Sequence, residues 1–268
     1  MRIYHARAAR ALAVQTELGG KLWGWAGRTL GGPARTADGR PVWLRLVAAP
    51  EAKASGKLWD GALDAQHALG DLGGHRPALL GVHDAFGDGM AYRAELSVRV
   101  EQAVLSADPI LHQALGLPAS WWEELAGTLE KLSGTGTGRV AVREAYMARA
   151  IPEFVKMPAP AVASWTTVHG DLHWANLTLP LRILDWEAWG QAPQGFDAAT
   201  LYAYTLLQPD DAHRVRATFP VLGSTEGLAA EAVVCAMLLQ TTERGDNQAL
   251  TDRLRAWAGE LRRRSGRN

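Results

Sequence analysis

Two short polar segments separated by a turn constrain this chain more than any other feature. The first reads VHGDLHWAN over residues 168–176, and the second reads ILDWE over residues 183–187. Phosphoryl transfer from a nucleotide needs a carboxylate that orients and deprotonates a hydroxyl, and oxygen ligands that hold magnesium against the phosphates. Asp171, Asn176 and Asp185 provide a carboxylate, an amide oxygen and a second carboxylate in that order. The pattern therefore predicts a phosphotransferase site.

At these residues the chain resembles the aminoglycoside phosphotransferase and choline kinase-like family of small-molecule kinases. HGDLHxxN followed by an apolar pair and DWE is that family's form of the catalytic and metal-binding loops. The segment GFDAA at residues 195–199 also resembles the family, which often has Gly-x-Asp at this point, opening a helix. The strong resemblance covers residues 165–205. It implies a two-lobed, protein-kinase-like α+β fold with a small β-rich N-terminal lobe and a larger helical C-terminal lobe.

The order of elements predicted along the chain agrees with such a fold. We place an N-terminal nucleotide-binding lobe at residues 1–96 and a helical C-terminal catalytic and substrate lobe at residues 97–268, with the site between the lobes. Apolar periodicity and turn residues predict helices over 5–18 and 54–69 and strands over 41–47, 78–86 and 90–100, with a hairpin turn at Asp38-Gly39. Further helices are expected over 119–132, 140–154, 197–207, 212–219, 227–244 and 248–264.

Each residue of the two segments has an expected role. Asp171 is the candidate catalytic base that accepts or orients the proton of the substrate hydroxyl. Asn176 and Asp185 are the candidate magnesium ligands, because a hard cation prefers oxygen donors. His169 is expected to lock the loop by hydrogen bonding. Asp197 either caps its own helix or, as the resemblance implies, braces the catalytic loop.

Two further residues near the segments have competing interpretations. His173 occupies a position where protein kinases usually have a cation near the transferred phosphate, so it is a candidate for nucleotide contact; local packing is the alternative. Glu187 is a candidate ligand of a second metal through water or of a cationic substrate. A surface salt bridge is its alternative role.

The predicted first lobe departs from the kinase pattern. Its strand after the hairpin should carry a lysine for the ATP phosphates, and this sequence offers Arg45, which is shaped differently. Trp43 lies on the same strand face and would either stack on a purine or narrow the pocket. The acid that pairs with Arg45 is expected to be Asp60 or Asp64. The hinge that binds the base through backbone groups is expected within residues 92–96.

Composition limits the partners of the protein. Lys plus Arg and Asp plus Glu both total 28, so the net charge is zero and no basic excess predicts nucleic-acid binding. Residues 1–100 contain 13 basic and 9 acidic residues, whereas residues 101–268 contain 15 and 19. The acidic second part suits a cationic substrate, or is simply a solvated acidic surface.

The sequence also bears on location and on the state of its thiol. No apolar run is long enough for a membrane span or a secretory signal, so we expect a cytoplasmic protein without membrane partners. The single cysteine, Cys235, lies in an apolar run and is expected to be a small buried hydrophobe.

Three functions remain in competition at this point. The first is an ATP- and Mg²⁺-dependent O-phosphotransferase acting on an aminoglycoside, an amino alcohol or a sugar-like hydroxyl compound. The second is a pseudokinase-like nucleotide- or ligand-binding protein, favoured by Arg45 and Trp43. The third is a metal-dependent phosphoesterase, because GDLH resembles the opening of a dinuclear metal motif. That class needs further histidines downstream, and His213 is the only one after His173.

Overall fold

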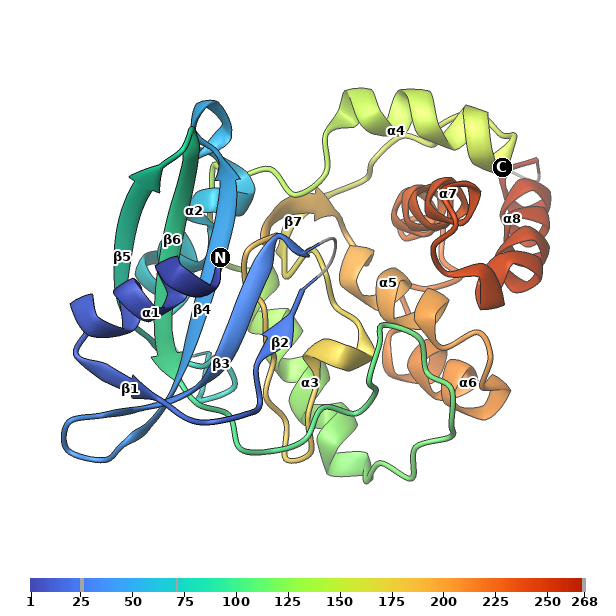
Figure 1. Cartoon of the computed structure of the whole chain (residues 1–268). Helices are drawn as coiled ribbons and strands as arrows, with labels where there is room; N and C mark the ends of the chain where they lie inside the picture. Colours follow the sequence, from blue (N-terminus) through green and yellow to red (C-terminus); the bar gives the residue numbers. More distant parts are fainter. Residues whose placement is uncertain (25–26, 71, 267–268) are drawn as a thin grey trace. The chain divides into compact units, whose positions relative to one another are not determined.

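The computed structural model describes residues 1–24, 27–70 and 72–266 of this mixed α+β protein. The chain divides into two compact units, Met1–Glu101 and Gln102–Asn268, each of which is described by itself. Figure 1 shows strands dominating the first unit and helices dominating the second. The expectation of an α+β chain with a strand-rich first part is therefore confirmed.

The first unit is built on a curled antiparallel sheet. Its strands are β1 (Val14–Thr16), β2 (Leu22–Trp23), β3 (Thr29–Thr36), β4 (Pro41–Pro50), β5 (Leu79–Gly87) and β6 (Met90–Val98). They are ordered β1-β3-β4-β6-β5, and β2 pairs with β3. The predicted hairpin at Asp38-Gly39 is confirmed, since it joins β3 to β4 and Gly39 adopts a φ of +83°.

The two faces of the sheet have different chemistry because side chains alternate along each strand. On β4, Val42, Leu44 and Leu46 are buried and pack against α1 (Arg2–Ala11). Figure 1 shows α1 crossing this face of the sheet. Burial of each such side chain contributes roughly 1.5–3 kcal/mol. Trp43 and Arg45 lie on the opposite face and stay partly exposed. The alternation thus places Trp43 and Arg45 on the face opposite the one that α1 covers.

Helix α2 (Lys57–Leu69) and a short 3₁₀ turn, η2 (Glu51–Lys53), join β4 to β5. Trp59 of α2 packs against Val47 and Ala91 of the sheet. The helix predicted over 54–69 is confirmed with a later start. It ends at Gly70, which takes a φ of +60° that a branched side chain would resist.

The predicted first helix was too long. It spans Arg2–Ala11, and Val14–Thr16 forms a strand that pairs with β3. Ala13 has a φ of +53°, which breaks the helix between the two elements. Pairing of Val14 with Thr36 and burial of the valine outweigh the local helical pattern.

The second unit is mainly helical and also contains a small antiparallel sheet. Its elements are α3 (Ala119–Ser133), α4 (Glu144–Ala150), η3 (Ile151–Val155), β7 (Trp165–Val168), η4 (Trp174–Asn176), β8 (Gly190–Pro193), α5 (Phe196–Tyr204), α6 (Pro209–Thr218), α7 (Leu228–Glu243), η5 (Gln248–Leu250) and α8 (Thr251–Ser265). Strand β7 pairs with β8, and most of the two polar segments, residues 168–176 and 183–187, lies between them in the chain. The pairing therefore brings both ends of that stretch together.

Helix α7 forms the centre of the second unit. It is apolar on almost every side, which is typical of a helix surrounded by protein. Figure 1 shows α8 lying alongside it, and the two helices are in contact. Cys235 is buried on α7 as expected, and burial raises the pKa of its thiol to about 12. Glu231 is also buried, and its carboxylate pairs with Arg264 at 2.9 Å.

The helix predicted over 140–154 is wrong in its extent and type. Residues 144–150 form α4, and residues 151–155 continue as a wider π-helical turn, η3. Pro152 has no backbone N–H and cannot complete an α-helical ladder, which explains the change of winding. The turn ends at Lys156, whose φ is +61°.

Candidate active site

The first polar segment, residues 168–176, is fixed at its start by Asp197, near the beginning of α5. The Asp197 carboxylate accepts the backbone N–H of His169 at 2.7 Å and that of Gly170 at 2.9 Å. Burial raises the pKa of Asp197, while the hydrogen bonds from the two N–H groups act in the opposite direction. Asp197 does not cap its own helix, where Gly195 is the N-cap residue. Its carboxylate braces the loop.

Gly170 allows the sharp turn before Asp171. Its φ is +83°, and a Cβ added to it would collide with the carbonyl oxygen of Ala188. Any other residue would suffer both the unfavourable backbone conformation and this collision with backbone. Steric constraints therefore require glycine at the middle position of the HGD sequence.

His169 connects the two polar segments. Its Nε2 lies 2.9 Å from the carbonyl oxygen of Leu184, and its Nδ1 accepts the backbone N–H of Asp171 at 3.3 Å. These two partners require a neutral ring with the proton on Nε2. The ring is fully buried and contacts the edge of Trp186, with ring centroids 4.6 Å apart. The geometry makes His169 a positioning residue for the Asp171 backbone.

Asn176 fixes the other end of the first segment. Its Nδ2 donates to the carbonyl oxygen of Asp171 at 3.0 Å, and its own carbonyl oxygen accepts the N–H of Leu184 at 2.8 Å. Among the residues that the structure describes, no hydrogen bond is formed by the Asn176 side-chain oxygen. Asp185 follows Leu184 directly and adopts a φ of +60°. Leu184 is thus bound through its backbone to both His169 and Asn176, which positions Asp185.

The Asp171 carboxylate is 48% exposed and its Oδ2 lies 3.5 Å from His173 Nε2. His173 is largely enclosed, with a side-chain exposure of 11%, and its Nδ1 is buried without a hydrogen-bond partner in the described part of the chain. The His173 ring meets the edge of Tyr204, with centroids 5.7 Å apart. An accessible carboxylate therefore lies on a loop whose backbone is held at several points.

Tyr204 was not predicted as part of this site. It lies at the end of α5, and burial followed by the charge of Asp171 raises the pKa of its phenol well above the usual range. A side-chain hydrogen bond from Asn247 acts in the opposite direction. No local pattern places Tyr204 beside Asp171, because its position depends on how α5 packs.

Glu187 lies in the turn after Asp185. Its carbonyl oxygen accepts from Arg139 Nη2 at 3.4 Å, and the Arg139 guanidinium also lies 4.9 Å from the ring centroid of Trp189. Trp186 and Trp189 are both buried. These contacts fix the backbone of the turn, while the metal or substrate role of the Glu187 carboxylate stays a prediction.

In the first unit, Arg45 pairs with an acid that was not expected. Its Nη1 lies 3.1 Å from Oε2 of Glu95, which is directly opposite on β6 and has a side-chain exposure of 8%. Asp60 accepts a hydrogen bond from Arg93 at 3.0 Å. Pairing of Arg45 with Asp60 or Asp64 stays a prediction, and Glu95 is a partner that the sequence did not indicate.

Trp43 packs on the neighbouring strand. A Cβ on Gly31 of β3 would lie 2.8 Å from the indole Nε1 of Trp43, so the indole occupies the space that a side chain would fill. Gly31 is also the residue opposite Arg45 on β3. Trp43 and Arg45 therefore lie side by side along one strand, on the sheet face opposite α1.

The predicted hinge was misplaced. Residues 92–96 lie within β6, which pairs with β4 on one side and with β5 on the other. Their backbone groups are engaged in these ladders and are not available to a nucleotide base. The strand ends at Val98, so any hinge segment begins at Arg99 or later.

Two features are absent from the described residues. They contain no group of three or more His, Cys, Asp or Glu side chains arranged to hold a metal ion. Within the same residues, no helix combines the length and apolar character needed to cross a bilayer.

Comparisons with known proteins identify the fold. The sequence matches no family model and no curated protein. Solved structures do match, including a thermostable mutant of an aminoglycoside phosphotransferase, with a TM-score of 0.61, 15% identity, and coverage of 93% of this chain and 95% of the other. An amicoumacin kinase solved with AMP-PNP, Ca²⁺ and Ami has a TM-score of 0.61 at 10% identity, with coverage of 98% and 93%.

A choline kinase from Streptococcus pneumoniae gives a TM-score of 0.54 at 12% identity, with 97% of each chain covered. The chain has the protein-kinase-like α+β fold of small-molecule kinases. The fold implied by the resemblance at residues 165–205 is thus confirmed across nearly the whole chain. These three structural neighbours are described as an aminoglycoside phosphotransferase, an amicoumacin kinase and a choline kinase.

Proposed function

We propose that this protein transfers the terminal phosphoryl group of ATP to a hydroxyl of a small molecule, with magnesium as the metal. The observation that carries the proposal is the half-exposed Asp171 carboxylate on a loop fixed by Asp197, His169 and Asn176. A base that must meet a reacting hydroxyl has to be accessible and held in one orientation. The Asp171 carboxylate is accessible, and its backbone is bound on both sides, which supports this role.

Asp171 would act as the base. Its carboxylate would accept a hydrogen bond from the acceptor hydroxyl and take its proton as the oxygen bonds to phosphorus and the bond to the ADP oxygen breaks. The backbone of Asp171 is bound on both sides, by His169 at its N–H and by Asn176 at its carbonyl oxygen. These contacts limit the movement of the base during the reaction.

The donor set fits a magnesium ion. Asn176 would provide its side-chain oxygen, since Nδ2 is the atom that binds the Asp171 backbone, and Asp185 would provide a carboxylate oxygen. The bound metal would offset negative charge on the phosphates. Glu187 remains a candidate for a second metal or for a cationic group of the acceptor.

Nucleotide recognition is assigned to separate residues. In the first unit Arg45 would bind phosphate oxygens, and Trp43 would contact the purine face. In the second unit His173 would donate to the phosphoryl group in transit. The use of AMP-PNP in the structures of an amicoumacin kinase and of an aminoglycoside phosphotransferase supports ATP as the donor.

The acceptor is proposed to be an aminoglycoside, an amino alcohol or a sugar-like compound. Structural neighbours include a choline kinase and a phosphotransferase solved with hygromycin B. The acidic excess of residues 101–268, 19 against 15, suits an acceptor with amino groups.

A direct assay tests the proposal. Purified protein with ATP and Mg²⁺ is incubated with a panel of aminoglycosides, amino alcohols and sugars, and ADP and the phosphorylated product are measured. Asp171→Asn should reduce kcat by about 10³-fold with unchanged thermal unfolding. Asp252→Asn, at a carboxylate that is 95% exposed, is the matched control and should retain full activity. Equal turnover by Asp171→Asn would disprove the role of the base.

The second candidate is a nucleotide-binding protein without transferase activity. It is favoured by the Arg45–Glu95 pair, since this cross-strand contact holds the guanidinium in place of the lysine and helix acid of active kinases. Calorimetric titration with ATP, with and without Mg²⁺, separates the two functions. If the affinity for ATP were the same with and without Mg²⁺, and if no acceptor led to formation of ADP, this candidate would be favoured.

A further inference from the structure

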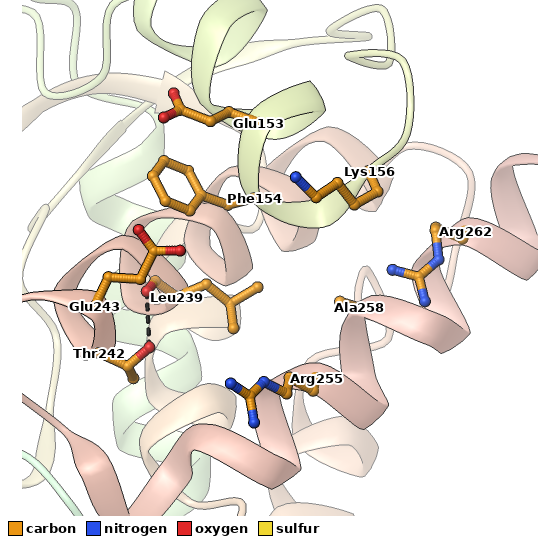
Figure 2. A pocket seen from close by; sticks show the side chains of 9 residues that line it. All are labelled: Glu153, Phe154, Lys156, Leu239, Thr242, Glu243, Arg255, Ala258 and Arg262. Atoms are coloured by element: carbon orange, nitrogen blue, oxygen red, sulfur yellow. Dashed lines mark hydrogen bonds between the residues drawn. The ribbon is translucent and has the colours of Figure 1, made fainter.

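A cavity of about 390 Å³ lies in the second unit among η3, α7 and α8. Figure 2 shows its lining, which consists of Glu153, Phe154, Lys156, Leu239, Thr242, Glu243, Arg255, Ala258 and Arg262. It includes none of the residues assigned to phosphoryl transfer. Its volume falls in the lower part of the range of pockets that hold small molecules.

The π-helical turn shapes one wall of this cavity. Pro152 interrupts the α-helical ladder, and the wider turn that follows carries Glu153 and Phe154. Lys156 ends the turn in the left-handed region, at a φ of +61°, where glycine would be less strained. Strained residues of this kind and π-helical turns both concentrate at functional sites.

The charges of the lining are segregated. In the view of Figure 2, the carboxylates of Glu153 and Glu243 lie on the two sides of the Phe154 ring. Lys156, Arg255 and Arg262 extend along the rest of the cavity. Carboxylates beside an aromatic face attract an ammonium group, whereas guanidinium and ammonium groups attract a carboxylate or phosphate.

Two of these charges have no partner elsewhere. In the part of the chain that the structure describes, Lys156 and Glu243 form neither a hydrogen bond nor an ion pair through their side chains. Arg262 donates to the Val155 carbonyl oxygen at 2.9 Å and is thereby held at the end of η3. A cation and an anion that face one cavity are therefore available to a ligand.

The geometry points to a binding site for a small zwitterion in this cavity. The ligand carries an ammonium group, bound between Glu153 and Glu243 against Phe154, and an anionic group, bound by Lys156 and Arg255. The aliphatic surface of Leu239 and Ala258 contacts the chain that joins the two groups. This inference does not depend on the transferase proposal, because it uses none of the same residues.

Calorimetry on the full chain tests the site with defined probes. The zwitterions are γ-aminobutyrate, ε-aminocaproate and phosphoethanolamine, and the single-charge controls are caproate and hexylamine. We expect at least one zwitterion to bind at least tenfold more tightly than either control, because only a zwitterion engages both ends. Tighter binding of phosphoethanolamine identifies phosphate as the anionic group, and tighter binding of an amino acid identifies carboxylate.

Variants at the two unpartnered charges locate the site. Lys156→Gln and Glu243→Gln should each weaken binding about three- to tenfold. Both residues are exposed, so circular dichroism should show an unchanged fold. The matched controls, Arg253→Gln and Glu123→Gln, are exposed residues outside the cavity and should leave binding unchanged.

Three results would overturn the inference. The first is binding of caproate or hexylamine as tight as that of the zwitterions. The second is an equal loss of binding in the control variants. The third is no heat of binding from any zwitterion at about 10 mM, well above the millimolar dissociation constant expected from a few polar contacts.

Discussion

Two regions, the loop at residues 168–176 in the second unit and the strand face that carries Arg45 in the first unit, are each stabilised by a different kind of contact. In the loop, side chains bind backbone groups: Asp197 binds two N–H groups, and Asn176 binds the Asp171 carbonyl oxygen. On the strand face, charged side chains bind one another, as in the Arg45–Glu95 and Arg93–Asp60 pairs. Contacts from side chains to the backbone hold the backbone in one conformation. In an ion pair on a sheet, by contrast, a charged side chain can pair with another neighbouring charge instead.

This difference predicts that the loop tolerates substitution far less than the strand face. Gly170→Ala should cause the largest loss, because the added Cβ would meet the Ala188 carbonyl oxygen at a positive φ. We expect a destabilisation of about 3 kcal/mol and loss of transferase activity. Urea unfolding and the ADP assay measure the two effects.

Gly127→Ala is the control for that experiment. Gly127 lies within α3, and no heavy atom lies within 4 Å of the position that a Cβ would take there. Alanine should therefore stabilise the helix by about 0.5–1 kcal/mol. If Gly170→Ala behaved like Gly127→Ala, the steric account of the HGD turn would be wrong.

Asn176 is the next most sensitive position. Asn176→Ala removes both the contact with the Asp171 backbone and a candidate magnesium ligand. We expect the Mg²⁺ concentration for half-maximal activity to rise at least about tenfold and kcat to fall. A titration of activity against Mg²⁺ checks this, and an unchanged metal requirement would remove Asn176 from the ligand set.

The strand face should show a smaller response. Glu95→Gln removes the carboxylate that pairs with Arg45 and should cost about 1–2 kcal/mol of stability. Because the guanidinium would then be less well oriented, we expect KM for ATP to rise more than kcat falls. Arg40→Gln, which removes the exposed Arg40–Asp38 pair, is the control and should change neither quantity.

The smallest expected effect concerns pH. Burial raises the pKa of Asp197 above its usual value of 3.8, so the folded state binds this proton more tightly than the unfolded state does. Stability contributed by protonated Asp197 is therefore present at low pH and is lost as pH rises above 3.8 through the folded-state pKa.

Urea unfolding of the wild type and of Asp197→Asn between about pH 4 and 7 measures this linkage. The difference in the free energy of unfolding between the wild type and Asp197→Asn should decrease as pH rises, because asparagine does not ionise. If this difference increased with pH, the two N–H bonds would lower the pKa of Asp197 more than burial raises it. For Asp252→Asn, at an exposed site, the difference in free energy of unfolding from the wild type should stay constant with pH.

The contrast between the two regions also explains which features the sequence could indicate and which it could not. The sequence placed Asp171, Asn176 and Asp185 on adjoining segments because the contacts within 168–187 are short in sequence. It did not place Glu95 opposite Arg45, since cross-strand register depends on how β4 aligns with β6. The hinge was wrongly expected within residues 92–96, because the sequence does not show that β6 pairs with a strand on each side.

Other errors came from local patterns that tertiary contacts overrode. The apolar spacing over 5–18 favoured one helix, but pairing of Val14 with β3 made its second half a strand. Tyr204 entered the surroundings of Asp171 through the packing of α5, and no periodicity signals that approach. The π-helical turn at residues 151–155 was also missed, although Pro152 marks its position.

The sequence by itself determined the fold class and the order of acid, amide and acid in the two polar segments at residues 168–176 and 183–187. These depend on local sterics and on contacts a few residues apart, which a linear pattern records. Tertiary structure alone decided the partner of Arg45, the position of Tyr204 and the cavity beside η3. Those depend on strand register and helix packing, where residues distant in sequence meet and the free energy of burial selects among several local possibilities.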